Sequence, residues 1–235
     1  IFMRGMIAAG KIDDSIAILK AFAAFEENGT LPNIIYGTTA GNRDTTDAQL
    51  WFIRCVQEID ALGLKAAEIA VLKKTCESIV DNYIKGTSNG IRVDKESALV
   101  YSPSHFTWMD TNYPACTPRQ GYPVEIQALW ISALKYLGRG EMADKALASV
   151  KKYFKRAYGG YYDCLAAPNG ESAAAAVPEP TIRPNELFLI TLGILDDISI
   201  LAETEELLIP GAVVYMEGND DPKRKTAWTS RSSPR

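Results

Sequence analysis

Apolar residues recur at helical spacing along most of the chain. In residues 14–27, DSIAILKAFAAFEE, Ile16 and Leu19 lie on one stripe, and Asn-Gly at 28–29 supplies the backbone conformation that commonly ends a helix. The same spacing predicts helices over residues 2–9, 46–62, 65–85, 123–137, 141–157, 184–194 and 196–208. The chain is therefore predicted to be all-α, with about eight helices.

The junctions between these helices alternate in length. Residues 10–13 and 138–140 are short and polar, whereas the long junctions are rich in Trp, Tyr, Asn, Pro and Gly and cover residues 29–44, 86–122 and 158–183. This alternation favours antiparallel helix pairs in a ring or solenoid, with the long junctions on one functional face. An irregular helical bundle is the alternative, because no repeat of fixed period is found. Within the second long junction, residues 91–102 predict a short β-hairpin.

Composition and charge limit the classes of protein to which the chain can belong. The chain has 235 residues, of which 47% are apolar and 23% charged, as expected for one globular domain with a sizeable core. A net charge of −4 gives no basic footprint for nucleic acid, and the basic run at residues 223–225 is interpreted as a solvated tail. No run approaches the ~18 apolar residues of a membrane-spanning helix. We therefore expect neither nucleic acid nor membrane as a partner.

The cysteines and the single histidine argue against a metal site. The four cysteines form no CxxC pair, and a single histidine provides too few ligands for a typical zinc site. Cys55 and Cys76 lie in predicted helices and are interpreted as buried thiols, which favours a reducing, cytoplasmic setting. The chain begins with Ile1, and we expect the start of the polypeptide to lie elsewhere.

The richest group of chemically useful side chains lies in residues 105–130, HFTWMDTNYPACTPRQGYPVEIQALW. Prolines and turn-forming residues predict a loop for its first half, and this loop presents Asp110 close to Trp108. An apolar neighbour favours a protonated carboxyl group, which a general acid in glycoside cleavage requires. Alternatively, Asp110 stabilises its own loop by accepting backbone hydrogen bonds, and Trp108 is either a sugar-stacking platform or a core residue.

The second half of this segment opens a predicted helix. Glu125 lies in the first turn, where a carboxylate also compensates the helix dipole. Arg119 could pair with Glu125 or Asp110, or donate a hydrogen bond to a sugar hydroxyl. His105 is interpreted as a structural donor, and Trp130 as a core residue because it lies inside an apolar helix.

Two other predicted helices begin with similar residues. Asp44 and Asp47 precede an apolar helix that contains Trp51, and Arg183 and Asn185 flank a proline at a third helix start. If the helix pairs close into a ring, these helix starts converge and offer carboxylates, amides and aromatic faces, which suit a neutral sugar. The chain contains no GxGxxG, GxxxxGK[ST] or GxSxG motif, so neither a nucleotide cofactor nor serine-hydrolase chemistry is indicated.

Taken together, these stretches resemble the glycogen-debranching family, in its C-terminal amylo-α-1,6-glucosidase domain. HFTWMD followed by TPRQGYPVEIQALW resembles the family signature, LPNIIYG…NRDTTDAQLWFI its "IPN … DA-LWF" segment, and TIRPNELFLITL its "RPN" helix. The motifs occur in the family's order within residues 1–211, and the sequence diverges after that. We therefore expect a partial glucosidase-type helical domain over residues 1–211 and a divergent or truncated tail over residues 212–235.

The resemblance implies a fold and an activity. The fold is an (α/α)6 toroid of helix pairs, incomplete within this chain, and the reaction is hydrolysis of α-1,6-linked glucose at glycogen branch points with inversion. The resemblance implies that Asp110 is the general acid. The residues expected to bind substrate are Asp47, Trp108, Arg119, Glu125, Arg183 and Asn185. The family's proposed base is a glutamate beyond the RPN helix, so the second carboxylate of the inverting mechanism is expected outside the chain.

The implied partner is a branched α-glucan, either glycogen or a limit dextrin, with no cofactor and no metal. The resemblance also leaves room for an upstream domain of the same polypeptide. Two other functions stay open. A non-catalytic glycan-binding or scaffolding remnant would account for the missing base. Another inverting α-glucosidase, or a trehalase-like enzyme on the same toroid, would use similar side chains.

Overall fold

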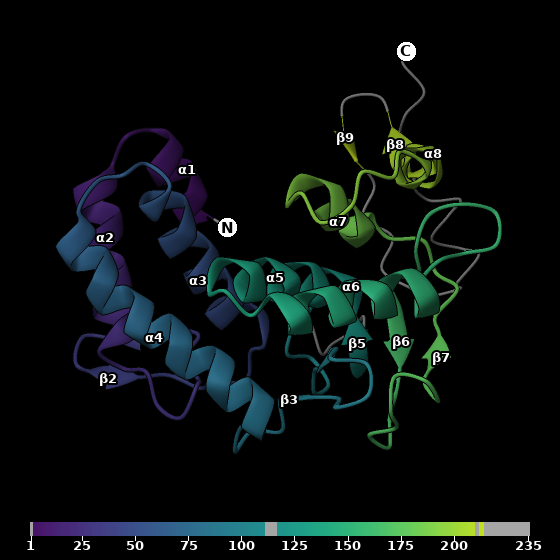
Figure 1. The fold of residues 1–235 in the computed structure, drawn as a ribbon, viewed down its shortest axis with the longest axis horizontal. Coiled ribbons are helices and arrows are strands. Elements are labelled where there is room, and N and C mark those ends of the chain that lie inside the picture. Colours follow the sequence, from purple (N-terminus) through teal and green to yellow (C-terminus); the bar gives the residue numbers. More distant parts are fainter. Residues whose placement is uncertain (1, 111–116, 210–211, 214–235) are drawn as a thin grey trace, which may run out of the picture.

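The computed structural model describes residues 2–110, 117–209 and 212–213. These residues form eight α-helices: α1 Phe2–Ala8, α2 Ile12–Ala23, α3 Asp47–Asp60, α4 Ala66–Lys85, α5 Val124–Tyr136, α6 Gly140–Tyr153, α7 Leu187–Thr191 and α8 Ser199–Thr204. Consecutive helices contact each other, α1 with α2, α3 with α4 and α5 with α6. In Figure 1 the first four helices are grouped at one end of the molecule, α7 and α8 lie at the other, and α5 and α6 run between them.

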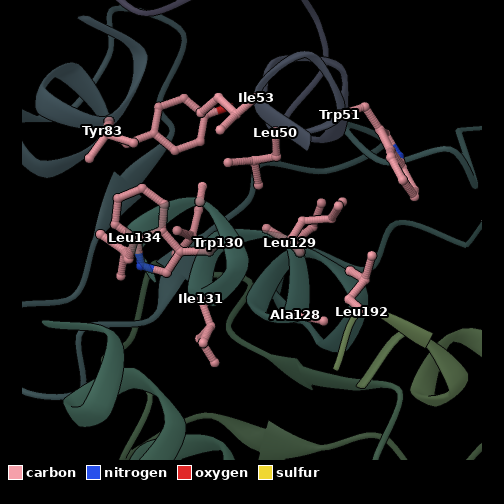
Figure 2. Close-up of a cluster of buried hydrophobic side chains, with 14 of the residues drawn as sticks. Leu50, Trp51, Ile53, Tyr83, Ala128, Leu129, Trp130, Ile131, Leu134 and Leu192 are labelled. Atoms are coloured by element: carbon pink, nitrogen blue, oxygen red, sulfur yellow. The ribbon is translucent and has the colours of Figure 1, made fainter. Parts of the chain in front are cut away.

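Helix α5 is the centre of the core. Every residue from 124 to 134 is buried, and the helix contacts α3, α6 and α7. Trp130 is fully buried, stacks on Tyr83 of α4 at a ring distance of 6.0 Å, and donates from Nε1 to the Ala98 carbonyl oxygen at 3.0 Å. Figure 2 shows these two rings among the aliphatic side chains of α3 and α5. The prediction that Trp130 is a core residue is thus confirmed.

Short strands form within the long junctions. They are β1 Ile35–Tyr36, β2 Thr39–Ala40, β3 Arg92–Val93, β4 Val100–Tyr101, β5 Gly121–Pro123, β6 Cys164–Ala166, β7 Val177–Pro178, β8 Leu208–Ile209 and β9 Ala212–Val213. Strands β5, β6 and β7 form one antiparallel sheet in that order, and the others pair as β1–β2, β3–β4 and β8–β9. The predicted hairpin within residues 91–102 is confirmed by β3 and β4.

The all-α expectation is therefore met in part. The core is helical, but long junctions carry many backbone N–H and C=O groups, and strand pairing satisfies them where they approach each other. The last predicted helix pair is also shorter than expected. Residues 184–186 form a 3₁₀ turn (η1, Pro184–Glu186) ahead of α7, and α8 covers only Ser199–Thr204.

Three other expectations, on the cysteines, the domain boundary and membrane spans, can be compared with the structure. Cys55 and Cys76 are free and buried, as predicted. The expected boundary at residue 211 falls between the paired strands β8 and β9, and most of the expected tail, residues 214–235, lies outside the described residues. In the described part of the chain, no helix is both long and apolar enough to cross a membrane.

Candidate active site

A cavity of about 400 Å³ opens between α1, α2, the start of α3 and the loop that carries Asp110. Its lining combines apolar and aromatic side chains with polar groups. The lining residues are Met3, Leu19, Phe22, Leu31, Pro32, Asn33, Asp44, Thr45, Asp47, Ala48, Trp51, Phe52, Cys55, Thr107, Trp108 and Asp110. The cavity thus brings together three carboxyl groups, an amide, hydroxyls and two tryptophans, a lining that suits a small neutral polar ligand.

Asp47 is fixed at the first turn of α3. Thr45 Oγ1 donates to Asp47 Oδ1 at 2.9 Å and accepts from the Ala48 amide at 3.2 Å. Burial raises the pKa of Asp47, and the nearby negative charge of Asp110 raises it further, while the Thr45 hydrogen bond only partly opposes this shift. The Asp47 carboxyl group can therefore hold a proton more readily than an ordinary aspartate.

The side chains of residues 107–110 alternate between buried and exposed positions, and the buried Thr107 also borders the cavity. Thr107 and Met109 are 4% exposed, whereas Trp108 is 40% exposed and Asp110 is also exposed. Trp108 and Asp110 both line the cavity. The buried residues therefore hold the loop, and the exposed ones are available to a ligand.

Asp110 also borders a second cavity of about 250 Å³. This cavity is mostly polar and is lined by Asn33, Asn42, Asp44, Ser104, His105, Phe106 and Asp110. Asn33, Asp44 and Asp110 are common to both cavities. Asp110 thus lies, with Asn33 and Asp44, where a partly aromatic cavity adjoins a polar one.

The loop that carries Asp110 is anchored at both ends. The Thr46 amide donates to the Phe106 carbonyl oxygen at 2.6 Å, which joins the start of α3 to this loop. The His105 amide donates to the Pro118 carbonyl oxygen at 3.0 Å, so residues 105 and 118 lie side by side. His105 and Arg119 have φ values of +62° and +45°, which are uncommon for residues other than glycine. Such backbone strain persists where surrounding contacts impose it, often at functional sites.

Four of the predicted substrate-binding residues meet in a buried polar cluster beneath this loop. Arg119 Nη1 and Nη2 donate to the two oxygens of Glu125 at 2.5 and 2.6 Å. Arg183 and Asn185, from the start of η1, reach the same cluster. All four residues are at most 3% exposed. The predicted convergence of these two helix starts is therefore observed.

Asp163 joins the members of this cluster. Its Oδ2 accepts from Arg119 Nε at 2.8 Å and from Arg183 Nη1 at 2.7 Å, and its Oδ1 accepts from Arg119 Nη2 at 3.1 Å and from Asn185 Nδ2 at 2.7 Å. Burial opposes the charge on Arg119, but the Asp163 and Glu125 carboxylates outweigh it and hold the pKa of Arg119 well above its ordinary value. The buried charges are thus paired.

Asp163 was not predicted from the sequence. Strand pairing of Pro123 with Cys164 places it next to the start of α5, where its carbonyl oxygen accepts from the Val124 amide at 2.9 Å. The available signal was a single charged residue inside the otherwise aromatic and apolar run YYDCLA. A charge in such a run is seldom buried unless it is paired.

The structure thus divides the predicted site residues into two groups. Asp47, Trp108 and Asp110 meet at the larger cavity. Arg119, Glu125, Arg183 and Asn185 meet in the buried cluster, and they are not among the described residues that line these two cavities. Direct contact between these four side chains and a sugar stays a prediction. Within the described ranges, no group of three or more His, Cys, Asp or Glu residues is arranged to hold a metal ion.

Comparisons with known proteins agree with a carbohydrate-active fold. A family model described as amylo-alpha-1,6-glucosidase matches residues 1–206. Among solved structures, the rhamnosidase from Klebsiella oxytoca with rhamnose bound is similar in fold, with a TM-score of 0.54 and 12% sequence identity. The alignment covers 80% of this chain and 36% of the rhamnosidase, so the chain spans about a third of that protein's length. No curated protein matches the chain in sequence.

Proposed function

The chain belongs to the amylo-α-1,6-glucosidase family, and from this membership we propose that it hydrolyses α-1,6-linked glucose at the branch points of an α-glucan such as glycogen. We further propose that its helix pairs form part of an (α/α)6 toroid and that the reaction inverts the anomeric centre. The family and the fold of the rhamnosidase support the broader class, a glycoside hydrolase-like domain.

The observation that carries this proposal is the position of Asp110. A general acid in glycoside cleavage protonates the oxygen that joins the departing sugar to the rest of the substrate. That oxygen lies between two sugar-binding positions, and two aspartates, Asp44 and Asp110, line both cavities. Of these two, Asp110 is the one that the resemblance of HFTWMD to the family signature indicates. We therefore assign the general acid to Asp110, the terminal glucose to the larger cavity and the departing chain to the polar one.

The lining of the larger cavity supports a neutral sugar. Trp51 and Trp108 offer aromatic faces for sugar C–H groups, and Asp47, Thr45 and Asn33 offer partners for hydroxyls. Among the described lining residues of this cavity there is no lysine, arginine or histidine to attract an anionic group. Its volume of about 400 Å³ lies in the range of small-ligand pockets.

The four residues of the buried cluster support the site indirectly in this proposal. Arg119, Glu125, Arg183 and Asn185 pair with one another or with Asp163, are at most 3% exposed and are not among the described residues that line the two cavities. The proposed location remains cytoplasmic, and the free thiols of Cys55, Cys76 and Cys164 accord with a reducing setting.

A substrate panel tests the proposed function. We expect the protein to release glucose from a 6-O-α-glucosyl maltooligosaccharide, and to leave trehalose and an aryl α-L-rhamnoside intact. Proton NMR of the first product should show β-glucose, because inversion of an α-linkage gives the β-anomer. Hydrolysis of trehalose or the rhamnoside alone, or α-glucose as first product, would contradict the proposal. Binding of maltooligosaccharides in calorimetry without any hydrolysis would favour a glycan-binding role instead.

A further inference from the structure

The loop that carries Asp110 is held from the interior at two points. Arg119 Nη1 donates to Thr107 Oγ1 at 3.2 Å, and Asn185 Nδ2 lies 3.2 Å from Met109 Sδ as a donor. Thr107 Oγ1 also accepts from the Met109 amide at 3.3 Å. The two inward residues of the loop are therefore attached to the buried cluster, while Asp110 faces the cavity.

Both attachments depend on the same carboxylate. Asp163 accepts from Arg119 Nε at 2.8 Å and from Asn185 Nδ2 at 2.7 Å. The carbonyl oxygen of the Asn185 side chain is buried and accepts no hydrogen bond from the described residues, so Asp163 is what orients this amide. Glu125 accepts from Nη1 and Nη2 of Arg119, while Asp163 accepts from its Nε and Nη2, so the two carboxylates together fix the plane of the guanidinium and the direction in which Nη1 reaches Thr107.

We propose that Asp163 is a positioning residue, which acts through Arg119 and Asn185 to set the place of Asp110. This inference rests on the proposed function, because it matters for catalysis only if Asp110 is the acid. Asp163 does not line either cavity, so it is not expected to touch the substrate. A displacement of about 1 Å in a catalytic group can cost roughly a hundredfold in rate, so a buried device that fixes the loop has a measurable effect.

The test separates positioning from mere stability. Amide hydrogen exchange of the segment 103–110 is measured in wild type, Asp163→Asn, Thr107→Val and Thr107→Ser. Thr107→Val removes the hydroxyl that accepts from Arg119 and leaves the ion pairs intact, whereas Thr107→Ser retains it. The same hydroxyl accepts from the Met109 amide, so that amide is left out of the comparison. Ser132→Ala is the matched control, since Ser132 Oγ also accepts from an arginine, Arg54, at 3.2 Å, but does not line either cavity.

We expect Asp163→Asn and Thr107→Val to speed exchange in this segment about tenfold, the effect of losing one net hydrogen bond. Thr107→Ser and Ser132→Ala should exchange as wild type does. In glucose-release assays Thr107→Val should lower kcat about tenfold to a hundredfold, with KM nearly unchanged. If Asp163→Asn does not fold, Thr107→Val still shows whether the bond from Arg119 to Thr107 holds the loop.

Two results would overturn the proposal. One is unchanged exchange of segment 103–110 in Thr107→Val, and the other is an equal acceleration in Ser132→Ala. The outcome is distinguishable from failure of the proposed function. If wild type releases no glucose but the exchange pattern is as expected, the loop is positioned as proposed and only the activity is wrong.

Discussion

Replacement of Asp163 by asparagine is expected to lower the free energy of unfolding by roughly 3–5 kcal/mol. The carboxylate is 1% exposed and accepts hydrogen bonds from Arg119, Arg183 and Asn185. Asparagine keeps the shape but removes the charge, and it replaces one acceptor oxygen with an NH₂ group that only donates. Among the described residues, Arg183 then retains one carboxylate partner, Glu179, whose side chain is 28% exposed. The positive charge of the buried Arg183 guanidinium thus loses most of the negative charge that balances it.

Urea unfolding followed by circular dichroism measures this loss. For a chain of this length it corresponds to a decrease in Tm of roughly 6–20 °C. The control is Asp81→Asn, which removes the same kind of partner from Arg139, but at a surface where the two side chains are 44% and 47% exposed. That change is expected to cost less than about 1 kcal/mol. If Asp163→Asn costs no more than Asp81→Asn, Asp163 does not hold the buried cluster together.

Three further experiments test the burial of Asp47, the burial of two cysteines and the conformation of Gly121. Burial raises the pKa of Asp47, so the folded state binds its proton more tightly than the unfolded state, and stability falls as pH rises above the ordinary value of about 3.9. Asp47→Asn should therefore raise Tm at pH 7 and lose this gain below pH 4, and a gain independent of pH would contradict this. Burial raises the pKa of Cys55 to about 11 and that of Cys76 to about 12, so neither thiol should react with iodoacetamide at pH 8 until the chain unfolds. Mass spectrometry should find both cysteines unmodified in the folded chain, and labelling there would contradict this prediction. Gly121→Ala should cost more than ~2 kcal/mol in urea unfolding, because φ is +133° and a Cβ would collide with the Leu165 carbonyl oxygen; a smaller cost would mean that the strand pair adapts.

The long helices could be predicted from the sequence because their signal is local. The stripe over residues 65–85 predicts a helix that the structure has at Ala66–Lys85. The last helix was predicted too early, at residue 196. Asp197 accepts from the Ser199 amide at 3.1 Å and from its hydroxyl at 2.6 Å, so the helix begins at Ser199. A side chain that caps a helix from outside competes with the apolar pattern.

The site could be predicted only in part. The helix start at residue 47 and the family resemblance of HFTWMD made Asp47 and Asp110 candidates, but their meeting at one cavity depends on contacts such as Thr46 to Phe106, which link distant segments. Asp163 was missed for the same reason, since its partners Arg119 and Arg183 lie 44 and 20 residues away in the chain. Periodicity carries no information about such pairs.

The buried state of Arg119 and Glu125 also could not be read from the sequence. Both carry charges and lie near aromatic residues, a pattern that fits a sugar-binding surface as well as an internal ion pair. The structure places them as a pair within the interior, 3% and 1% exposed. The β5–β6 pairing brings their partner Asp163 beside the start of α5, and that pairing joins residues more than 40 positions apart.

The most direct measurement is glucose release from a 6-O-α-glucosyl maltooligosaccharide by the protein and its Asp110→Asn variant. If Asp110 donates the proton to the departing oxygen, the variant should lose roughly 10²–10⁴-fold in kcat. It should still bind the substrate in calorimetry, because the cavity walls are unchanged. Asp144→Asn, at an exposed position on α6, makes the same chemical change away from the cavities and should keep the wild-type rate. Undiminished release by Asp110→Asn would contradict the assignment of the acid and of the cavity junction as the active site.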